Sequence, residues 1–360
     1  MQIDLFRPSV PPLSAYYSYL ELIESNQIYS NFGPIHHKFK KRLADYFNIG
    51  EENIELFSSG TMALVAALIA LQTINKDEVR PYCLLPSWTF VATVQSVIAA
   101  GLTPIFVDVE EQSMQLTKNM IEQVSNEILL KTSVVLVVSP FGAPLILEGY
   151  DLLCQTYGFE VLCDCAAGFE SAKSFNFHTV ISLHATKIFG IGEGGLLISI
   201  NKKLIEYAKA YSNFGFLNSR KSITRGINGK FSEIQAAIGL AALDLWGSNK
   251  KDYYQKAAYY LEAAFNLPFQ FQEGWGRDWV SSTCVIRFDD ESQKKSVQKD
   301  WANNKIQTRD WWNQGCHLEP AFCHYEFINI RNNTNILAKT TLGIPFYKDI
   351  SQDSINHIFK

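Results

Sequence analysis

The segment 159–187 reads FEVLCDCAAGFESAKSFNFHTVISLHATK and contains two largely apolar runs, each followed by a side chain that can carry chemistry. The first run, 159–164, closes with Asp164, and the second, 179–183, leads into Lys187. Runs that are apolar throughout, without strict alternation, are typical of strands covered on both faces in a mainly parallel sheet. The segment therefore favours an α/β fold in which ligands bind beyond the carboxyl ends of the strands.

The same pattern of short apolar runs and longer amphipathic stretches extends from about residue 54 to residue 200. It predicts further strands at 54–57, 82–85, 104–107, 133–138 and 196–200, and helices at 61–71, 90–100 and 148–157. After about residue 240, a helical segment at 249–264 precedes short strand-like pieces and Trp-rich loops. We therefore expect a large domain over 1–240 and a smaller α+β domain over 241–360.

Length and charge narrow the class of protein. A chain of 360 residues is longer than the roughly 250–300 residues at which one hydrophobic core stops growing. Its 47% apolar and 19% charged residues exclude a disordered or fibrous chain. The net charge of −4 comes without a block of like charges, so neither a nucleic-acid-binding nor a membrane-binding surface is indicated. Small molecules or other protein chains are the expected partners.

Cysteine usage and the N-terminal sequence bear on the compartment. The seven cysteines are odd in number and scattered without a CxxC pair, which favours free thiols over disulfides or a zinc site and predicts no bound metal. The N-terminal MQIDLFRP lacks the basic and then apolar order of a signal peptide. No apolar run reaches the ~18 residues needed to span a bilayer. We therefore expect a cytoplasmic protein.

The end of the first predicted strand is a candidate anion site. Ser58-Ser59-Gly60-Thr61 follows the strand at 54–57 and opens the next helix. Small residues at a helix N-terminus let backbone N–H groups approach an anion such as a phosphate. The same serines are common helix N-caps, so this feature alone leaves both interpretations open.

Asp164 and Lys187 are the other two candidates. A carboxylate at Asp164, beside the small residues 165–168, stays ionised only with a cationic partner or several hydrogen-bond donors. A protonated pyridine nitrogen would be such a partner, and helix capping is the alternative. Lys187 lies between an apolar strand and a glycine-rich turn, where desolvation can make its amine nucleophilic, although a solvated loop lysine is commoner. An anion cradle, a buried carboxylate and a strand-end lysine together are what a pyridoxal phosphate site requires.

Several short motifs follow one another in an order that is specific to one family. They are SGTMAL (59–64), PSWTFVAT (86–93), DCA (164–166), SLHATK (182–187), GEGG (192–195), GIN (226–228) and EIQAAIG (233–239). Together they resemble the DegT/DnrJ/StrS family of pyridoxal-phosphate-dependent sugar aminotransferases. The resemblance runs from Asn31 to Pro345, nearly the whole chain.

The resemblance implies the aspartate aminotransferase (type I) fold and a homodimer whose active sites lie between subunits. Lys187 would bind pyridoxal 5'-phosphate as a Schiff base, Asp164 would pair with the pyridine nitrogen, and Phe90 would stack on the ring. The cofactor phosphate is assigned to the backbone of Gly60, Thr61 and Met62, to the Ser182 hydroxyl and, from the neighbouring subunit, to Asn228. For Asn228, a loop side chain that satisfies its own backbone is the alternative.

Two positions depart from the family pattern. Ala167 stands where Gln or His usually reaches towards the phenolic oxygen of the cofactor, which puts the tuning of the ring in doubt. Lys230 stands where Arg is common, which keeps the charge but loses the planar fork of donors.

The resemblance also implies the reaction. L-glutamate would donate an amino group to a nucleotide-linked keto-deoxy sugar. The segments 182–187 and 308–317 look like the subgroup that acts on 4-keto-6-deoxyhexoses. We therefore favour a dTDP-linked 4-keto-6-deoxyglucose aminated at carbon 4, for O-antigen or another surface glycan. Trp311, Trp312 and His317 are candidates for the sugar-nucleotide pocket, and His184 for a contact beside Lys187, with packing as the alternative for all four.

Other functions stay open from the sequence. Amination at carbon 3, or of a GDP- or UDP-linked sugar, fits the same motifs. A non-catalytic regulatory relative would have lost Lys187 or Asp164, and both are present. A cysteine desulfurase would need a mobile catalytic cysteine, for which Cys316 and Cys323 are candidates.

Overall fold

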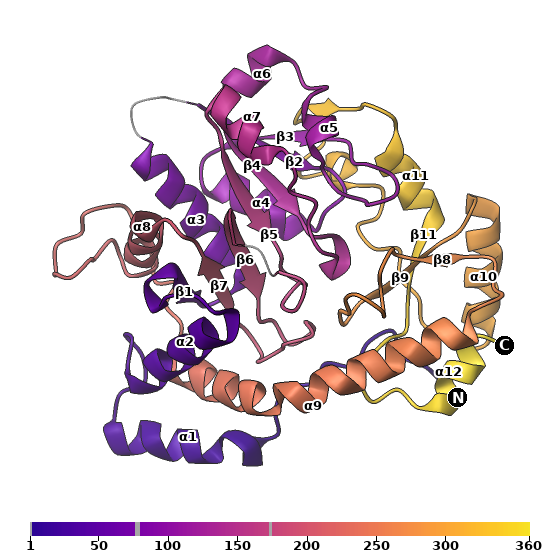
Figure 1. Cartoon of the computed structure of the whole chain (residues 1–360), viewed down its shortest axis with the longest axis horizontal. Helices are drawn as coiled ribbons and strands as arrows, with labels where there is room; N and C mark the ends of the chain where they lie inside the picture. Colours follow the sequence, from indigo (N-terminus) through magenta and orange to yellow (C-terminus); the bar gives the residue numbers. More distant parts are fainter. Residues whose placement is uncertain (1, 76–79, 173–174) are drawn as a thin grey trace.

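Eight strands form the central sheet of the computed structural model, which describes residues 2–75, 80–172 and 175–360 (Figure 1). In spatial order they are β1 (Ile54–Phe57), β7 (Gly195–Ile198), β6 (His178–Ser182), β5 (Glu160–Asp164), β4 (Thr132–Val138), β2 (Tyr82–Pro86), β3 (Thr103–Val107) and β10 (Phe327–Ile328). All seven runs that the sequence predicts as strands in this region form strands, with ends within two residues of the predicted ones. The expected α/β class is confirmed.

The strand directions decide where the chemistry can gather. The six strands from β6 to β10 in the spatial order run parallel. Strand β7 is antiparallel to both β6 and β1, so β1 points in the same direction as β6. The carboxyl ends of β1, β2, β4, β5 and β6 therefore share one edge of the sheet. That edge collects segments that lie more than a hundred residues apart in the sequence.

Helices cover both faces of the sheet, as the unbroken apolar strands predict. In β4, Val134 and Leu136 belong to one hydrophobic cluster, whereas Val135 and Val137 belong to the cluster on the opposite face. The first cluster includes residues of α3 (Gly60–Ile74), α4 (Val91–Ala99) and α8 (Lys202–Ser212), and the second includes residues of α2 (Pro34–Phe47), α7 (Tyr150–Tyr157) and α9 (Glu233–Ala263). The sheet is therefore the middle of three layers.

The helix predicted at 249–264 is the second half of a longer helix, α9, so its predicted start is wrong. Helix α9 begins at Glu233, where a capping box of Ser232 and Gln235 satisfies the first backbone N–H groups. Residues 236–243 of α9 are all apolar or small and are mostly buried, so this stretch lacks the amphipathic period that the prediction relied on. The helix passes without a break from the large sheet to the C-terminal part of the chain (Figure 1). The domain boundary predicted at 240/241 falls inside it and stays a prediction.

The C-terminal part is built on a small antiparallel sheet in the order β11 (Thr341–Ile344), β9 (Cys284–Arg287) and β8 (Gln270–Phe271). Helices α10 (Glu291–Asn303), α11 (Asn333–Thr340) and α12 (Gln352–Ile358) accompany it. The remaining elements are α1 (Leu13–Asn26), α5 (Lys118–Ile121), α6 (Asn126–Leu130) and the 3-10 helices η1 (Glu51–Asn53), η2 (Pro140–Gly142) and η3 (Cys316–Leu318).

Residues 3–7, which we call the N-terminal strap, pack on the C-terminal part of the chain. Ile3 pairs with Ile306, and the Leu5 carbonyl accepts a hydrogen bond from the Phe346 amide at 3.1 Å. Both chain termini consequently lie at the same end of the molecule (Figure 1). The strap therefore joins the first residues of the chain to its last hundred.

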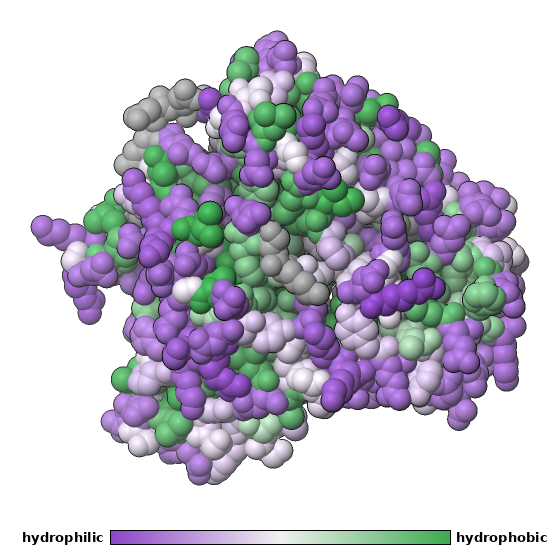
Figure 2. Space-filling model, viewed as in Figure 1, coloured by the Kyte–Doolittle hydropathy of each residue, from purple (hydrophilic) through white to green (hydrophobic). Residues whose placement is uncertain are grey.

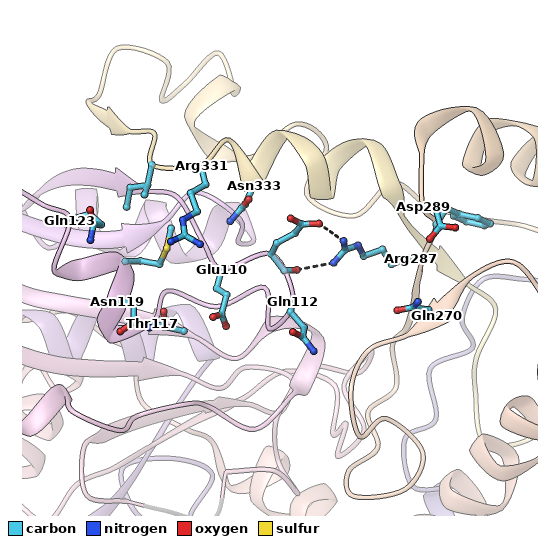
Figure 3. Close-up of a pocket in the computed structure, with 14 residues that line it drawn as sticks. Glu110, Gln112, Thr117, Asn119, Gln123, Gln270, Arg287, Asp289, Arg331 and Asn333 are labelled. Carbon is cyan, nitrogen blue, oxygen red and sulfur yellow. Dashed lines mark hydrogen bonds and ion pairs between the residues drawn. The ribbon is translucent and has the colours of Figure 1, made fainter.

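Two polar contacts fix the large sheet against the C-terminal part. Asp108, directly after β3, accepts hydrogen bonds from the backbone amides of Arg331, Asn333 and Thr334 at 2.8–3.0 Å and so caps α11. Nearby, the Arg287 guanidinium donates to both the carbonyl and the carboxylate of Glu111 across a polar cleft of about 560 Å³ (Figure 3). Both contacts join elements that are more than 170 residues apart.

Polar side chains cover most of the face seen in Figure 2, with hydrophobic residues scattered among them. Among the described helices, none combines the length and the hydropathy that crossing a bilayer requires.

We expect Asp108→Ala to destabilise the protein by roughly 2 to 4 kcal/mol, because it leaves several buried N–H groups without an acceptor. Asp290→Ala is the matched control, since Asp290 caps the exposed start of α10 through the amides of Ser292 and Gln293. Urea unfolding followed by circular dichroism should show a clearly larger loss for Asp108→Ala. Equal losses in the two variants would contradict a special role for Asp108 at the domain junction.

Candidate active site

A cavity of about 600 Å³ opens at the carboxyl edge of the large sheet, between the sheet and the C-terminal part. Six of the residues assigned to the cofactor from the sequence line it together: Gly60, Thr61, Phe90, Asp164, Ser182 and Lys187. They come from β1, β2, β5 and β6 and the segments that follow these strands. The strand directions alone explain why residues so far apart in the chain meet here.

The start of α3 forms a cradle for an anion. The amides of Gly60 and Thr61 lie in the first turn, where no carbonyl within the helix can accept from them. A Cβ at Gly60 would lie 2.9 Å from the Ser182 Cβ, so glycine is needed for this close approach. The Ser182 hydroxyl accepts from the His184 amide at 3.3 Å, which leaves its own proton free to donate. These groups fit a phosphate.

Met62 contributes less directly to this cradle. Its amide already donates to the Ser59 hydroxyl at 3.1 Å, the N-cap bond of α3, and its side chain is absent from the cavity lining. The assignment of the Met62 backbone to the phosphate stays a prediction.

Asp164 is a buried carboxylate, 5% exposed, without a cation in ion-pair contact among the described residues. Its oxygens accept from the Thr93 hydroxyl at 2.8 Å and from the Ala166 amide at 3.1 Å. Burial raises the pKa of Asp164, and the two hydrogen bonds and the charge of Lys187 only partly oppose this. A protonated ring nitrogen would supply the missing positive partner.

Lys187 is held at the start of the glycine-rich turn. Its amide donates to the His184 carbonyl at 2.8 Å, and the neighbouring Thr186 carbonyl accepts from the Ser282 hydroxyl at 2.7 Å. Burial lowers the pKa of the Lys187 amine, and the attraction of Asp164 only partly offsets this. The amine is therefore neutral over a wider pH range than an ordinary lysine and is available as a nucleophile.

Phe90 presents an aromatic face to the cavity. It stands at the N-cap of α4, and its side chain is 56% exposed. The nearby Trp88, by contrast, is buried in the protein and only 1% exposed. A large aromatic ring at a cavity wall is a surface on which a planar ring can stack. With the cradle and Asp164, it completes a set of residues that fits pyridoxal phosphate.

Of the three residues expected to contact the sugar nucleotide, two line the cavity and one does not. Trp311 and Trp312 line the cavity, and Trp312 stacks on Phe141 at 4.1 Å between ring centroids. His317 is absent from the lining. Its ring lies 3.8 Å from the Phe327 ring, and its Nδ1 is 2.6 Å from the Ser87 hydroxyl. Contact between His317 and a sugar nucleotide stays a prediction that this placement does not favour.

Asn228 and Lys230 also lie away from this cavity. Asn228 is exposed, and its side-chain oxygen accepts from the Lys230 amine at 2.8 Å. Neither residue lines the cavity of its own chain. A contact between Asn228 and the cofactor of another subunit is compatible with this placement and stays a prediction.

The cysteine-based alternative gains no support from the described cavity. Cys316 is buried and its thiol points to the Thr89 carbonyl, and Cys323 is exposed but outside the lining. Cys284 does line the cavity, but burial raises the pKa of its thiol well above the usual value. A thiol held neutral in this way is a poor nucleophile.

Sequence reasoning missed several residues of the site. Thr93, which positions Asp164, lies three residues after Phe90, and that helical spacing is a signal that could have identified it. His184, held as an open candidate, lines the cavity and its Nδ1 lies 2.8 Å from the Thr186 hydroxyl. Phe6 and Arg309 also line the cavity. Arg309 lies in the segment 308–317 that resembles the sugar subgroup but was given no role of its own, and no local sequence pattern marks Phe6.

The amino-acid sequence of the chain is similar to a known family and to several known proteins. A sequence model of the DegT/DnrJ/EryC1/StrS aminotransferase family matches residues 16–360. The dTDP-4-amino-4,6-dideoxy-D-glucose transaminase of Shigella dysenteriae is 34% identical over 248 residues, 67% of this chain and 65% of that enzyme. The GDP-perosamine synthase of Escherichia coli O157:H7 is 30% identical over 250 residues, 67% of this chain and 66% of that enzyme. The match thus spans slightly less than two thirds of either relative.

The fold of the chain is also similar to that of a solved structure. A structure from Bacillus cereus that is assigned to the PLP-dependent aminotransferases has a TM-score of 0.91 at 29% identity. The alignment covers 100% of this chain and 99% of that one. The expected type I fold of pyridoxal-phosphate-dependent transferases is confirmed.

Asp164→Asn should stabilise the protein without cofactor, increasingly as the pH rises. Because burial raises the folded-state pKa of Asp164 above 3.8, the wild-type carboxyl stabilises the fold most at low pH and loses this contribution as the pH rises through the raised pKa. We expect the Tm difference between variant and wild type to grow over that interval. The loaded variant should lose several orders of magnitude in turnover, because it lacks a negative partner for the ring nitrogen. A pH-independent Tm difference, or near-normal turnover, would contradict these roles.

Proposed function

Because the chain belongs to the DegT/DnrJ/EryC1/StrS aminotransferase family, we propose that it transfers an amino group from L-glutamate to a nucleotide-linked keto-deoxy sugar. The membership, which agrees with the family and class expected from the motifs, also makes pyridoxal phosphate the cofactor. The observation that carries the proposal is the meeting of Lys187, Asp164 and the Gly60–Thr61 amides in one cavity. A regulatory relative without catalysis would have no use for this set.

For the acceptor, we favour dTDP-4-keto-6-deoxyglucose aminated at carbon 4. The name of the Shigella relative supports a dTDP-linked sugar, whereas a second relative at 30% identity carries the name of a GDP-linked product. Position 3 and other nucleotides are therefore outcomes of the same test. We place the reaction in the cytoplasm, which the seven free cysteines favour. The product would supply O-antigen or another surface glycan.

The residues of the chain divide the work of this reaction. Pyridoxal phosphate supplies an aldehyde that accepts the amino group and a ring that takes up electron density. The Gly60 and Thr61 amides and the Ser182 hydroxyl would bind its phosphate, and Phe90 would hold its ring plane. The Lys187 Nζ, whose pKa is lowered by burial, can anchor the cofactor and then take a proton from the substrate carbon and return it.

Asp164 is the positioning group for the charge on the ring. Its carboxylate would keep the ring nitrogen protonated, and the Thr93 hydroxyl holds the carboxylate through a hydrogen bond of 2.8 Å. The Thr89 hydroxyl lies 2.9 Å from that of Thr93 and extends the chain of hydrogen bonds. Ala167 lines the cavity with a methyl group at the position where the family commonly has Gln or His. An alanine side chain cannot donate the hydrogen bond that Gln or His would offer there.

We further propose a homodimer with shared active sites. The loop that follows α8 projects from the molecule (Figure 1). Asn228 lies at the base of this loop, where its backbone pairs with Asn213, and it does not line the cavity of its own chain. Large apolar side chains on and beside this loop are 40–52% exposed: Phe214, Ile223, Ile227 and Ile234. Exposed apolar groups near a polar loop favour contact with another chain.

The reaction itself is tested with the purified enzyme, glutamate and a panel of dTDP-, GDP- and UDP-linked keto sugars. We expect a yellow protein whose visible band bleaches with glutamate, and an aminated product by mass spectrometry with the preferred acceptor. Borohydride reduction should fix the cofactor to Lys187, and Lys187→Ala should show neither label nor product. Bleaching without any aminated sugar would remove the proposed acceptor class, and a colourless protein would remove the cofactor assignment.

Subunit complementation tests the shared site. Lys187→Ala and an Asn228 variant shown to be inactive by itself are mixed under conditions of proven subunit exchange. A mixed dimer assembles one site with both groups intact, so activity should reappear, up to about half of the wild-type specific activity in mixed dimers. The dimer should bury more than ~2,000 Å². A mixture that stays inactive, or a fully active monomer in sedimentation, would contradict the shared site.

A further inference from the structure

We propose that Arg309 is a specificity-determining residue that binds a pair of anionic oxygens on a substrate, either the carboxylate of the amino donor or the diphosphate of the nucleotide sugar. This inference rests on the proposed function. It arises from the part of the cavity wall that the C-terminal part of the chain supplies.

The backbone of Arg309 is fixed to the small sheet. Its amide donates to the Gly343 carbonyl at 3.0 Å, and the Gly343 amide donates to the Arg309 carbonyl at 2.8 Å. This two-way pairing places Arg309 beside β11 as an isolated antiparallel bridge. The Cα of Arg309 is thus held by a sheet instead of a free loop, which is the kind of support that precise binding needs.

Two aromatic rings flank the guanidinium of Arg309. Its Cζ lies 4.8 Å from the centroid of Trp311 and 5.4 Å from that of Phe6, which belongs to the N-terminal strap. Both rings line the cavity as well. Contacts of this kind orient a guanidinium without neutralising its charge.

No carboxylate among the described residues pairs with Arg309. The adjacent Asp310 pairs with Lys294 at 2.6 Å, and near the strap Asp4 and Asp349 lie 3.9 and 3.5 Å from Arg7. The acidic groups closest in sequence and along the strap are therefore already engaged. A guanidinium that is oriented by its neighbours but not paired keeps its five N–H donors available for a ligand.

The charges along the described cavity wall single out Arg309. The carboxylates in the lining are Asp164 and Glu193, and Asp164 is assigned to the ring nitrogen. The amine of Lys187 is assigned to the cofactor aldehyde. Arg309 is then the permanently charged cation of the described lining that has no assigned partner. It lines a volume of about 600 Å³ that also has to admit both substrates.

Both proposed substrates carry the group that such a cation recognises. Glutamate has two carboxylates and a nucleotide sugar has a diphosphate, and the planar fork of a guanidinium matches either with two parallel hydrogen bonds. The amino donor and the sugar nucleotide would occupy the cavity in turn, so Arg309 can serve one of them or both. The experiment distinguishes these sources.

The test compares the wild-type holoenzyme with Arg309→Gln, Arg309→Lys and Arg7→Gln. Arg7 is the matched control, because its guanidinium also lies over an aromatic ring, Tyr347 at 4.9 Å, but it is paired and lies outside the cavity lining. One arm measures bleaching of the visible band against glutamate concentration and the calorimetric binding of glutarate, which cannot react. The other measures the KM for the keto sugar and the calorimetric binding of dTDP.

We expect Arg309→Gln to weaken binding in at least one arm by about 10- to 100-fold, with the rate at saturation changed far less. Arg309→Lys keeps the charge but loses the fork, so it should recover part of the affinity, and Arg7→Gln should match the wild type. A loss confined to the glutamate and glutarate arm assigns the donor carboxylate, and one confined to the sugar and dTDP arm assigns the diphosphate.

Unchanged binding in both arms for Arg309→Gln, or an equal loss in Arg7→Gln, overturns the inference. If Arg309→Gln does not fold, Arg309→Lys decides, because this substitution retains the positive charge beside the two rings and removes only the planar fork. A wild-type protein without transaminase activity would refute the proposed function, whereas the binding of glutarate and dTDP would still decide the role of Arg309.

Discussion

The burial of Asp164 is the constraint on which the site depends. If attraction between Asp164 and Lys187 dominated, the pKa of the acid would fall and that of the amine would rise. The opposite holds for both groups, because loss of hydration outweighs their mutual attraction. Among the described residues, the Asp164 carboxylate has no cation in ion-pair contact. The Lys187 amine can react with an electrophile. A protonated pyridine that carries an aldehyde meets both needs in one molecule.

The shape of the cavity also depends on how the C-terminal part packs against the large sheet. The large sheet supplies Lys187 and Phe90, whereas Arg309 and Trp312 come from beyond residue 300. The two sets stay in register because Asp108 caps α11 and because Trp312 stacks on Phe141. The strap adds a third tie, which brings Phe6 from the start of the chain to the same wall. The wall formed by Arg309 and Trp312 is accordingly the part of the cavity most sensitive to the position of the C-terminal part, whereas Lys187 and Phe90 follow strands of one sheet.

Much of the fold and the cofactor side of the site could be read from the sequence, since both depend on local signals. Strand β5 is predictable because it is apolar along its length, and Asp164 is conspicuous because it ends that strand. Thr93 was missed although it lies one helical turn from Phe90, because its importance comes from reaching Asp164, 71 residues later. The first half of α9 was missed because residues 236–243 are all apolar or small and mostly buried, which removes the periodic signal. Ala167 was noticed as a departure, and its methyl group does line the cavity.

The sequence by itself determined the layered α/β class, the strand ends that bear Asp164, Lys187 and the Gly60–Thr61 amides, and the chemistry these residue types share. These features depend on neighbours within one strand or one helical turn, where the order of residues fixes their geometry. Only the tertiary structure decided that Arg309 stands unpaired between Phe6 and Trp311, and that His317 turns to Ser87 and away from the cavity. Such placements depend on packing between segments up to about 300 residues apart, and no local pattern encodes which distant side chain neutralises a charge and which leaves it free.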